Sequence, residues 1–195
     1  GCAGAQDTIA RMPIETDAVP SGMCAFTVSI TGLRGGHSGA EIHLPLGNAL
    51  QILWRIIAPL TNHRGVRIVS FTGGEKKNAI PREAQATILI PEGNFMTCLF
   101  GLHTRCNEVC ARLRHPNDLL DMRVVKATAP PRVWTSSTQG HFRAVMEQLP
   151  HGVLLWHPDV KDLVETSTNL AMVGEEGSDT LVITTQQRSS SERAL

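Results

Sequence analysis

The segment "NALQILWRIIAPL", residues 48–60, decides the fold class because it is a helix-like stretch between two strand-like runs. Its apolar residues recur around much of a helix, and Asn48 is a residue type that caps helix N-termini. The flanking runs, residues 24–31 ("CAFTVSIT") and 66–72 ("VRIVSFT"), are rich in β-branched and aromatic residues. A strand, a helix and a strand in this order predict a crossover that makes a parallel pair.

The same order of elements recurs further along the chain. Strand-like runs follow at 84–91, 119–128, 163–173 and 180–187, and helix-like runs lie at 92–114 and 137–149. Each half then reads strand, helix, strand, strand, and a hairpin adds an antiparallel neighbour to each crossover. We therefore expect an α+β fold, with a mixed β-sheet and helices packed on one face. It would be built from two ferredoxin-like βαββ units, as a duplicated domain.

The composition limits the classes of function. The chain has 195 residues, with 18 Lys and Arg against 18 Asp and Glu, and 42% of its residues are hydrophobic. This suffices for a packed core, whereas the absence of a basic stripe and the scarcity of aromatic residues argue against nucleic-acid binding. Neither a membrane-spanning apolar run nor a signal-peptide pattern is present. We expect a cytoplasmic protein without nucleic-acid or membrane partners.

The five cysteines are an odd number and lack the spacing of a disulfide framework. Cys98, Cys106 and Cys110 share one predicted helical face with His103, where a metal site is conceivable. The same surface also carries apolar residues, and free cysteine packs as a small hydrophobic residue. We interpret these cysteines as buried, reduced thiols, which fits a reducing compartment.

A glycine-rich turn surrounds one histidine. Residues 32–40, "GLRGGHSGA", place four glycines around His37. Glycine permits tight turns and also close approach of the backbone to a ligand, so His37 either shapes a turn or faces a ligand. The spacing is not that of a nucleophile elbow. His37 and His43 flank Glu41, but they lack both the spacing of a helical zinc motif and a clear third ligand.

Two other polar residues occupy positions suited to binding. Asn78 lies in "TGGEKKNAIPREA", residues 72–84, a turn between two predicted strands, and Arg188 closes the last strand. Each residue taken alone is also an ordinary turn or surface residue. An imidazole, an amide and a guanidinium are nevertheless what a site needs to hold a carbonyl and a carboxylate.

Four motifs together carry a family resemblance. These are "GCAG" (1–4), "GLRGGHSGAEIHLPLGNA" (32–49), "GGEKKNAIPREA" (73–84) and "VETSTNLAMV" (164–173). Over nearly its whole length the chain resembles the aminoacyl-histidine dipeptidases, which are carnosinase-type metallopeptidases within the wider family of acylases and carboxypeptidase G. The resemblance implies a catalytic domain with a two-metal centre, into which a lid or dimerisation domain is inserted.

By this resemblance the chain is the lid domain of a longer enzyme. Residues 1–19 would lead in from the missing catalytic domain, and residues 189–195 would begin the return to it. Residues 20–188 would form the lid, in units of about 20–115 and 116–188. The zinc ions of the two-metal centre would be held outside this chain, so we expect no metal ligand within it. The implied partners are a dipeptide substrate, the catalytic domain and a second copy in a homodimer.

The resemblance also assigns roles to three residues. His37 matches a catalytic histidine that polarises the scissile carbonyl and stabilises the oxyanion formed from it. Asn78 matches a residue that fixes the substrate backbone, and Arg188 matches one that binds the free carboxylate of the substrate. The implied activity is hydrolysis of Xaa-His dipeptides by the full-length enzyme, with the chain inactive on its own.

Two other functions stay open. The chain could be a non-catalytic dimerisation or binding module, in which His37 only shapes a turn. A self-contained hydrolase is disfavoured, because the motifs supply no pair of nucleophile and base.

Overall fold

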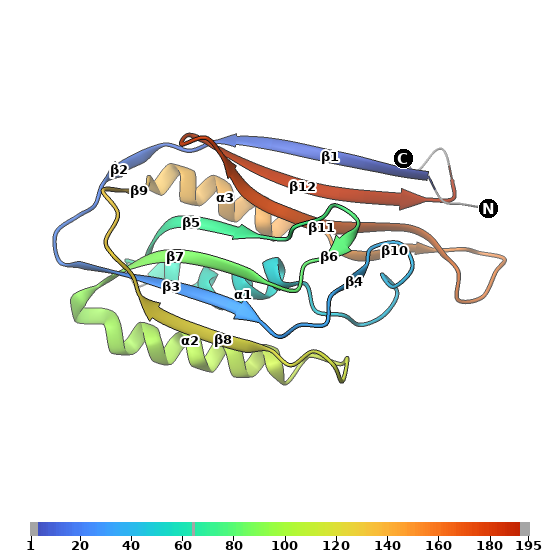
Figure 1. Cartoon of the computed structure of the whole chain (residues 1–195), viewed down its shortest axis with the longest axis horizontal. Helices are drawn as coiled ribbons and strands as arrows, with labels where there is room; N and C mark the ends of the chain where they lie inside the picture. Colours follow the sequence, from blue (N-terminus) through green and yellow to red (C-terminus); the bar gives the residue numbers. More distant parts are fainter. Residues whose placement is uncertain (1–3, 64, 192–195) are drawn as a thin grey trace.

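The computed structural model describes residues 4–63 and 65–191. Its main sheet has the strand order β1-β12-β11-β5-β7-β3-β8, with β10 paired to β11 (Figure 1). The strands of this sheet are β1 (Gly4–Pro13), β3 (Met23–Thr31), β5 (Arg67–Gly73), β7 (Ala84–Pro91), β8 (Asp121–Lys126), β10 (Gly152–Trp156), β11 (Val164–Glu176) and β12 (Thr180–Ser189). Two small ribbons pair β2 (Thr16–Ala18) with β9 (Arg132–Trp134) and β4 (Gly36–His37) with β6 (Ala79–Ile80). The helices are α1 (Ala49–His63), α2 (Phe95–Cys110), preceded by a 3₁₀ turn at Glu92–Asn94, and α3 (Ser136–Gln148).

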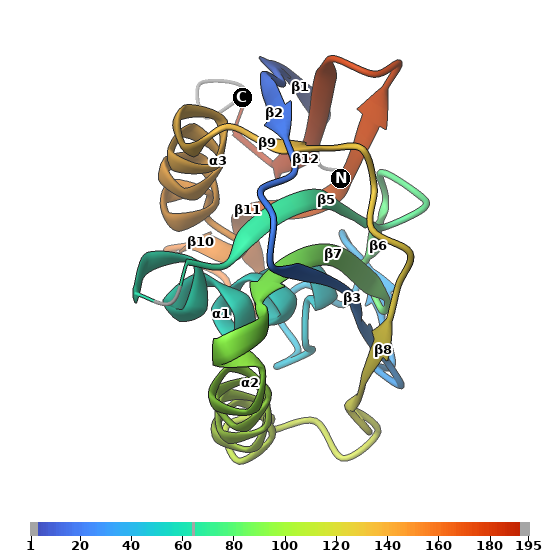
Figure 2. The ribbon, with the colours of Figure 1, turned by 90° about the vertical axis from the view of Figure 1, so that its left-hand side faces the viewer.

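The α+β class is confirmed, and helices α1, α2 and α3 pack on one face of the sheet (Figure 2). Strands β5, β7, β3 and β8, with α1 and α2, have the ferredoxin-like order, and β8 pairs with β3. The expected parallel pair is wrong, because β7 lies between β3 and β5 and pairs antiparallel with both. The crossover through α1 leaves a gap one strand wide between β3 and β5, and β7 fills it. Every strand pairing in the described ranges is therefore antiparallel.

The second half of the chain extends this sheet. The predicted helix and the last two predicted strands are present as α3, β11 and β12, and β11 and β12 form a long antiparallel hairpin. Strand β1 adds to the free side of β12 over its whole length, so part of the segment 1–19, expected only to lead in, is an edge strand. The sequence does not predict β10, because its run "GVLLW" is uniformly apolar and shows no alternation.

The core lies between the sheet and the helices. Along β3, Phe26, Val28 and Ile30 are buried in the main core, whereas the residues between them belong to the opposite face, as the alternation of a strand requires. Helix α1 contacts strands β3, β5, β7 and β11 and lies between α2 and α3. The predicted cap of α1 is confirmed, since Asn48 Oδ1 accepts hydrogen bonds from the backbone N–H groups of Leu50 and Gln51.

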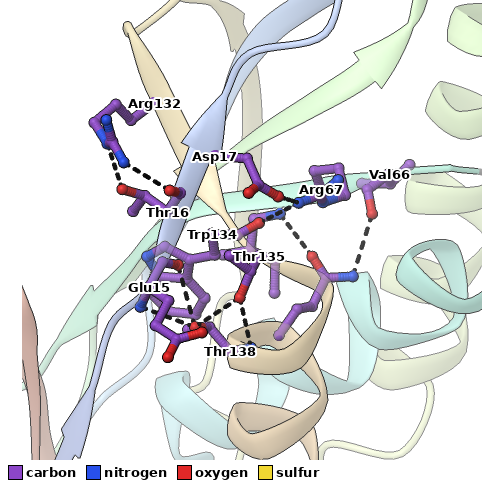
Figure 3. A network of polar contacts seen from close by, with 11 residues as sticks. Glu15, Thr16, Asp17, Val66, Arg67, Arg132, Trp134, Thr135 and Thr138 are labelled. Atoms are coloured by element: carbon purple, nitrogen blue, oxygen red, sulfur yellow. Dashed lines mark hydrogen bonds and ion pairs between the residues drawn. The ribbon is translucent and has the colours of Figure 1, made fainter.

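A network of polar contacts links the β2–β9 ribbon to β5 and α3 (Figure 3). Arg67 on β5 donates to the Asp17 carboxylate and to the backbone carbonyl of Trp134. The Gln139 side chain on α3 accepts from the N–H of Ile68 and donates to the carbonyl of Val66. These contacts satisfy backbone groups at the start of β5, which would otherwise be buried without partners.

The cysteine prediction holds in part. Cys98 and Cys106 are buried in the core as reduced cysteines outside any disulfide, and burial raises the pKa of the Cys106 thiol to about 11. Cys110 is exposed, contrary to the prediction, because it lies off the face of α2 that carries the buried residues Cys98, Leu102 and Cys106. In the described part of the chain no helix combines the length and apolarity needed to cross a membrane.

Candidate functional site

His37 lies on the β4–β6 ribbon, at the end of the sheet. His37 pairs with Ala79 across the ribbon, and the N–H of Ser38 donates to the carbonyl of Asn78 at 2.9 Å. The Asn169 side chain on β11 donates to the Ala79 carbonyl at 2.8 Å, so the ribbon is tied to the main sheet. His37 and Asn78 are both exposed. The fold thus brings together two predicted residues that are 41 positions apart in the sequence.

The hydrogen bonds of the His37 ring determine which ring nitrogen carries the proton. Nδ1 accepts from the backbone N–H groups of Gly39 and Ala40, each at 3.0 Å. In a neutral imidazole only one nitrogen carries a proton, so an Nδ1 that accepts leaves the proton on Nε2. Because the side chain is exposed, the ring presents a hydrogen-bond donor at the surface. The turn therefore orients His37 as a donor.

Glu41 holds the backbone of the turn in place. Its carboxylate accepts the His37 N–H at 2.8 Å and forms an ion pair with Arg34 at 2.5 Å. The hydrogen bond from His37, followed by that from Arg34, holds the pKa of the Glu41 carboxyl below its usual range. The carboxylate of Glu41 therefore serves to hold the turn. None of these contacts is with His43, so the two do not form a metal site together.

Two glycines of the turn lie close to neighbouring side chains. A Cβ on Gly36 would lie 2.7 Å from Leu46 Cδ1, and a Cβ on Gly39 would lie 3.0 Å from both Cζ and Nε of Arg188. Gly39 also donates its N–H to His37, so this residue lies between the imidazole and the guanidinium. The structure therefore brings Arg188 to the same turn as His37, from a strand near the other end of the chain.

Arg188 belongs to a partly buried network that joins the turn to β12 and β1. The guanidinium donates to Gln186 Oε1 at 3.2 and 3.3 Å, and the Ser38 hydroxyl donates to the same oxygen at 2.9 Å. The Gln186 amide in turn donates to Asp7 at 3.0 Å, and Lys77 forms an ion pair with Asp7 at 2.9 Å. The hydrogen bonds from Lys77 and Gln186 lower the pKa of the Asp7 carboxyl.

The sequence reasoning missed Ser38, Gln186, Asp7 and Lys77. Ser38 and Gln186 are polar but buried, and the Ser38 hydroxyl donates to the side-chain oxygen of Gln186. The wholly polar end of β12, "TTQQR", was the available signal, because polar residues at strand positions that alternation assigns to the interior need partners.

A cleft of about 610 Å³ opens beside the ribbon. Gly35, Gly36 and both residues of β6 line it, together with residues at the ends of β3, β5 and β7. Its charged lining residues have both signs: Arg34, Lys76, Arg82, Glu75 and Glu83. A peptide-sized molecule would therefore meet both cations and anions beside the His37 turn.

Metal ligands do not gather at this site. Within residues 4–63 and 65–191, no three His, Cys, Asp or Glu side chains are grouped so that they could hold an ion. The donor set beside His37 consists of N–H groups, an amide and a guanidinium, which bind anions and carbonyl oxygens rather than metals.

Residues 20–98, which include the His37 turn and strands β3, β5 and β7, match the family model of the peptidase dimerisation domain. Two relatives extend the likeness over nearly the whole chain. The chain is 32% identical over 173 residues to the cytosol non-specific dipeptidase of Escherichia coli (strain K12), a match that covers 89% of this chain and 36% of that protein. It also matches the crystal structure of an aminoacylhistidine dipeptidase from Vibrio alginolyticus, with a TM-score of 0.95, 29% identity and coverage of 99% of this chain and 39% of the other.

The resemblance drawn from the motifs is therefore confirmed as a likeness: residues 20–98 match the peptidase dimerisation domain, and two dipeptidases match over most of the chain. The chain spans less than two fifths of the length of either relative. The "GCAG" motif falls largely on residues 1–3, and the expected return segment largely on 192–195, both outside the described residues.

Proposed function

We propose that this chain is the lid domain of a metal-dependent dipeptidase that hydrolyses Xaa-His dipeptides in the cytoplasm. The observation that carries the proposal is the His37 ring, whose Nδ1 accepts two backbone N–H groups and whose Nε2 is left as an exposed donor. Arg188, at the same turn, supplies a guanidinium suited to a carboxylate. The two relatives that share this fold are dipeptidases by name.

Each residue then has a separate task. The Nε2–H of His37 donates to the scissile carbonyl oxygen and binds it more tightly as negative charge develops there. Arg188 pairs with the free carboxylate of the dipeptide, and Asn78 donates to or accepts from its backbone. The network of Ser38 and Gln186 holds the guanidinium in position, so the carboxylate meets an oriented cation.

The chemistry that this chain does not supply would come from the rest of a longer protein. The described residues hold no group of metal ligands, so zinc and its ligands are assigned to the catalytic domain that the relatives' greater length accommodates. Within this chain, the proposed contribution is limited to binding, orientation and stabilisation of charge.

The test uses the longer protein that contains this chain. Purified with zinc, it should hydrolyse Xaa-His dipeptides, lose the activity to a chelator and regain it when zinc is restored. A panel of Xaa-Ala dipeptides of matched charge tests the preference for histidine. Equal kcat/KM for both panels would refute the Xaa-His preference, and no hydrolysis of any dipeptide by the metal-loaded protein would refute the proposed function.

A second candidate function, homodimerisation, rests on a separate observation. Helix α2 exposes Met96 and Phe100, with 71% and 74% of each side chain accessible. They are four positions apart and so lie on one face of the helix, which forms an exposed apolar patch. We propose that this patch, beside the β8 edge of the sheet, joins two copies of the chain.

Sedimentation tests the dimer. A Met96→Glu/Phe100→Glu variant should sediment as a monomer at concentrations where the unaltered chain is a dimer. Ile9→Glu is the matched control, because Ile9 is an exposed apolar residue on β1, at the opposite edge of the sheet. A dimer that survives the α2 substitutions and dissociates with Ile9→Glu would place the interface at β1 instead.

A further inference from the structure

Behind the His37 turn lies a second hollow, of about 250 Å³, on the helical side of the sheet. It is bounded by the first two turns of α1, the end of α2 and the segment that precedes β10. Four basic side chains line it: Arg55 from α1, Arg112 and Arg114 from the segment after α2, and His151. We call it the arginine pocket.

The arginine pocket has no counter-charge in its lining. No Asp or Glu lines it, and none of its three arginines forms an ion pair in the described part of the chain. Other arginines on the surface, such as Arg105 and Arg143, are paired with a glutamate. The Asp118 carboxylate, which accepts the N–H of the lining residue Gly47, is buried, and its other oxygen accepts the N–H of Arg34. Like charges held around one hollow repel each other, and a bound anion would relieve that repulsion.

His151 adds a neutral donor. Asn48 Nδ2 also donates to the carbonyl of Leu170 at 2.8 Å, and it lies 3.2 Å from His151 Nδ1, which must therefore act as an acceptor. The proton of the ring is then on Nε2. Burial, followed by the charge of Arg55, lowers the pKa of His151 to about 4, so the ring is neutral at physiological pH. Three arginines and one neutral histidine thus line the pocket.

We propose that the arginine pocket binds the phosphate group of a small phosphorylated molecule. Guanidinium groups match the geometry of phosphate oxygens, and a tetrahedral dianion can accept from several of them at once. The pocket shares a wall with the His37 segment, because Leu46 lines the pocket and its Cδ1 is the atom that a Cβ on Gly36 would meet. A bound phosphate would therefore lie behind the turn that carries His37.

Isothermal titration of the 195-residue chain with inorganic phosphate, at constant ionic strength set by chloride, tests the proposal. One saturable site is expected, and Arg55→Gln and Arg112→Gln should each weaken binding at least about tenfold. Arg55→Lys keeps the positive charge but loses the paired N–H donors of the guanidinium, so its affinity for phosphate should be intermediate. The matched control is Arg105→Gln, which removes the same charge from α2 outside the pocket and should bind phosphate as the unaltered chain does.

Thermal unfolding of the same variants separates loss of binding from loss of structure. Arg55 and Arg112 are exposed, so both variants should unfold near the temperature of the unaltered chain without phosphate. Phosphate should raise the unfolding temperature of the unaltered chain and of Arg105→Gln, and should not raise that of the pocket variants. The proposal is overturned if no saturable binding occurs, or if the pocket variants bind phosphate as tightly as Arg105→Gln does.

Discussion

Acidification should destabilise this fold through one histidine. Burial and the neighbouring Arg55 lower the pKa of His151 from 6.5 to about 4 in the folded chain. The unfolded chain therefore takes up a proton on His151 at a higher pH than the folded chain does. The stability that neutral His151 preserves is fully present above about pH 6.5 and is lost as the pH falls toward 4.

The magnitude follows from the two pKa values. At about 1.4 kcal/mol for each pH unit between them, the full loss is about 3 kcal/mol. Between pH 7 and pH 5, before most carboxylates titrate, the same relation gives a loss of about 2 kcal/mol. That is a large part of the stability of a typical domain.

Urea unfolding followed by tryptophan fluorescence, in chloride buffers without phosphate, measures the effect at pH 7 and pH 5. His151→Gln keeps an acceptor for Asn48 but does not titrate, so its stability should fall by about 2 kcal/mol less than that of the unaltered chain over this interval. His103→Gln is the control, because His103 is exposed on α2, and it should behave like the unaltered chain. The reasoning is refuted if His151→Gln and the unaltered chain lose the same stability.

Four further substitutions test the packing. Asn48→Ala should lower the free energy of unfolding by roughly 2–3 kcal/mol in urea titrations, because it removes the cap of α1 and the partner of a buried carbonyl. Gly74→Ala should prevent folding or cost more than about 3 kcal/mol, since φ is +74° and a Cβ would lie 1.9 Å from a backbone oxygen. Gly177→Ala, with φ +70° and only an ordinary contact to the Asp179 side chain at 3.9 Å, should cost only about 1 kcal/mol. Gly39→Val should displace Arg188 and so raise KM of the longer protein for dipeptides, with little change in unfolding temperature. An unaltered KM would show that Arg188 does not bind the substrate carboxylate.

The helices and long strands could be predicted from periodicity, and the cap of α1 from the residue type of Asn48. Their arrangement could not. The crossover through α1 leaves a gap between β3 and β5, and β7 fills it. The local pattern of β7, "AQATILIP", would be the same if β7 lay outside β5, so the sequence pattern does not decide its place in the sheet. Strands β4 and β6 have two residues each, too few for any periodicity.

The candidate site was predictable as a set of residues but not as a geometry. His37, Asn78 and Arg188 were singled out by unusual local context and by the family resemblance. Their meeting depends on the β11–β12 hairpin and on Asn169, which ties the ribbon of β4 and β6 to the sheet. The tautomer of His37 depends on two N–H groups of its own turn, whose directions the sequence does not specify. The arginine pocket joins residues of three separate segments, so no local motif marks it.

The central claim is that His37 is an oriented donor to the substrate, and kcat of two histidine variants of the longer protein tests it most directly. His43 lies six positions further along the same segment and is also exposed, so His43→Ala is the matched control. His37→Ala should lower kcat by roughly 10²–10³-fold with a smaller effect on KM, as the loss of an oxyanion donor does, while His43→Ala should leave both near their original values. Equal kcat for His37→Ala and the unaltered protein would contradict the account.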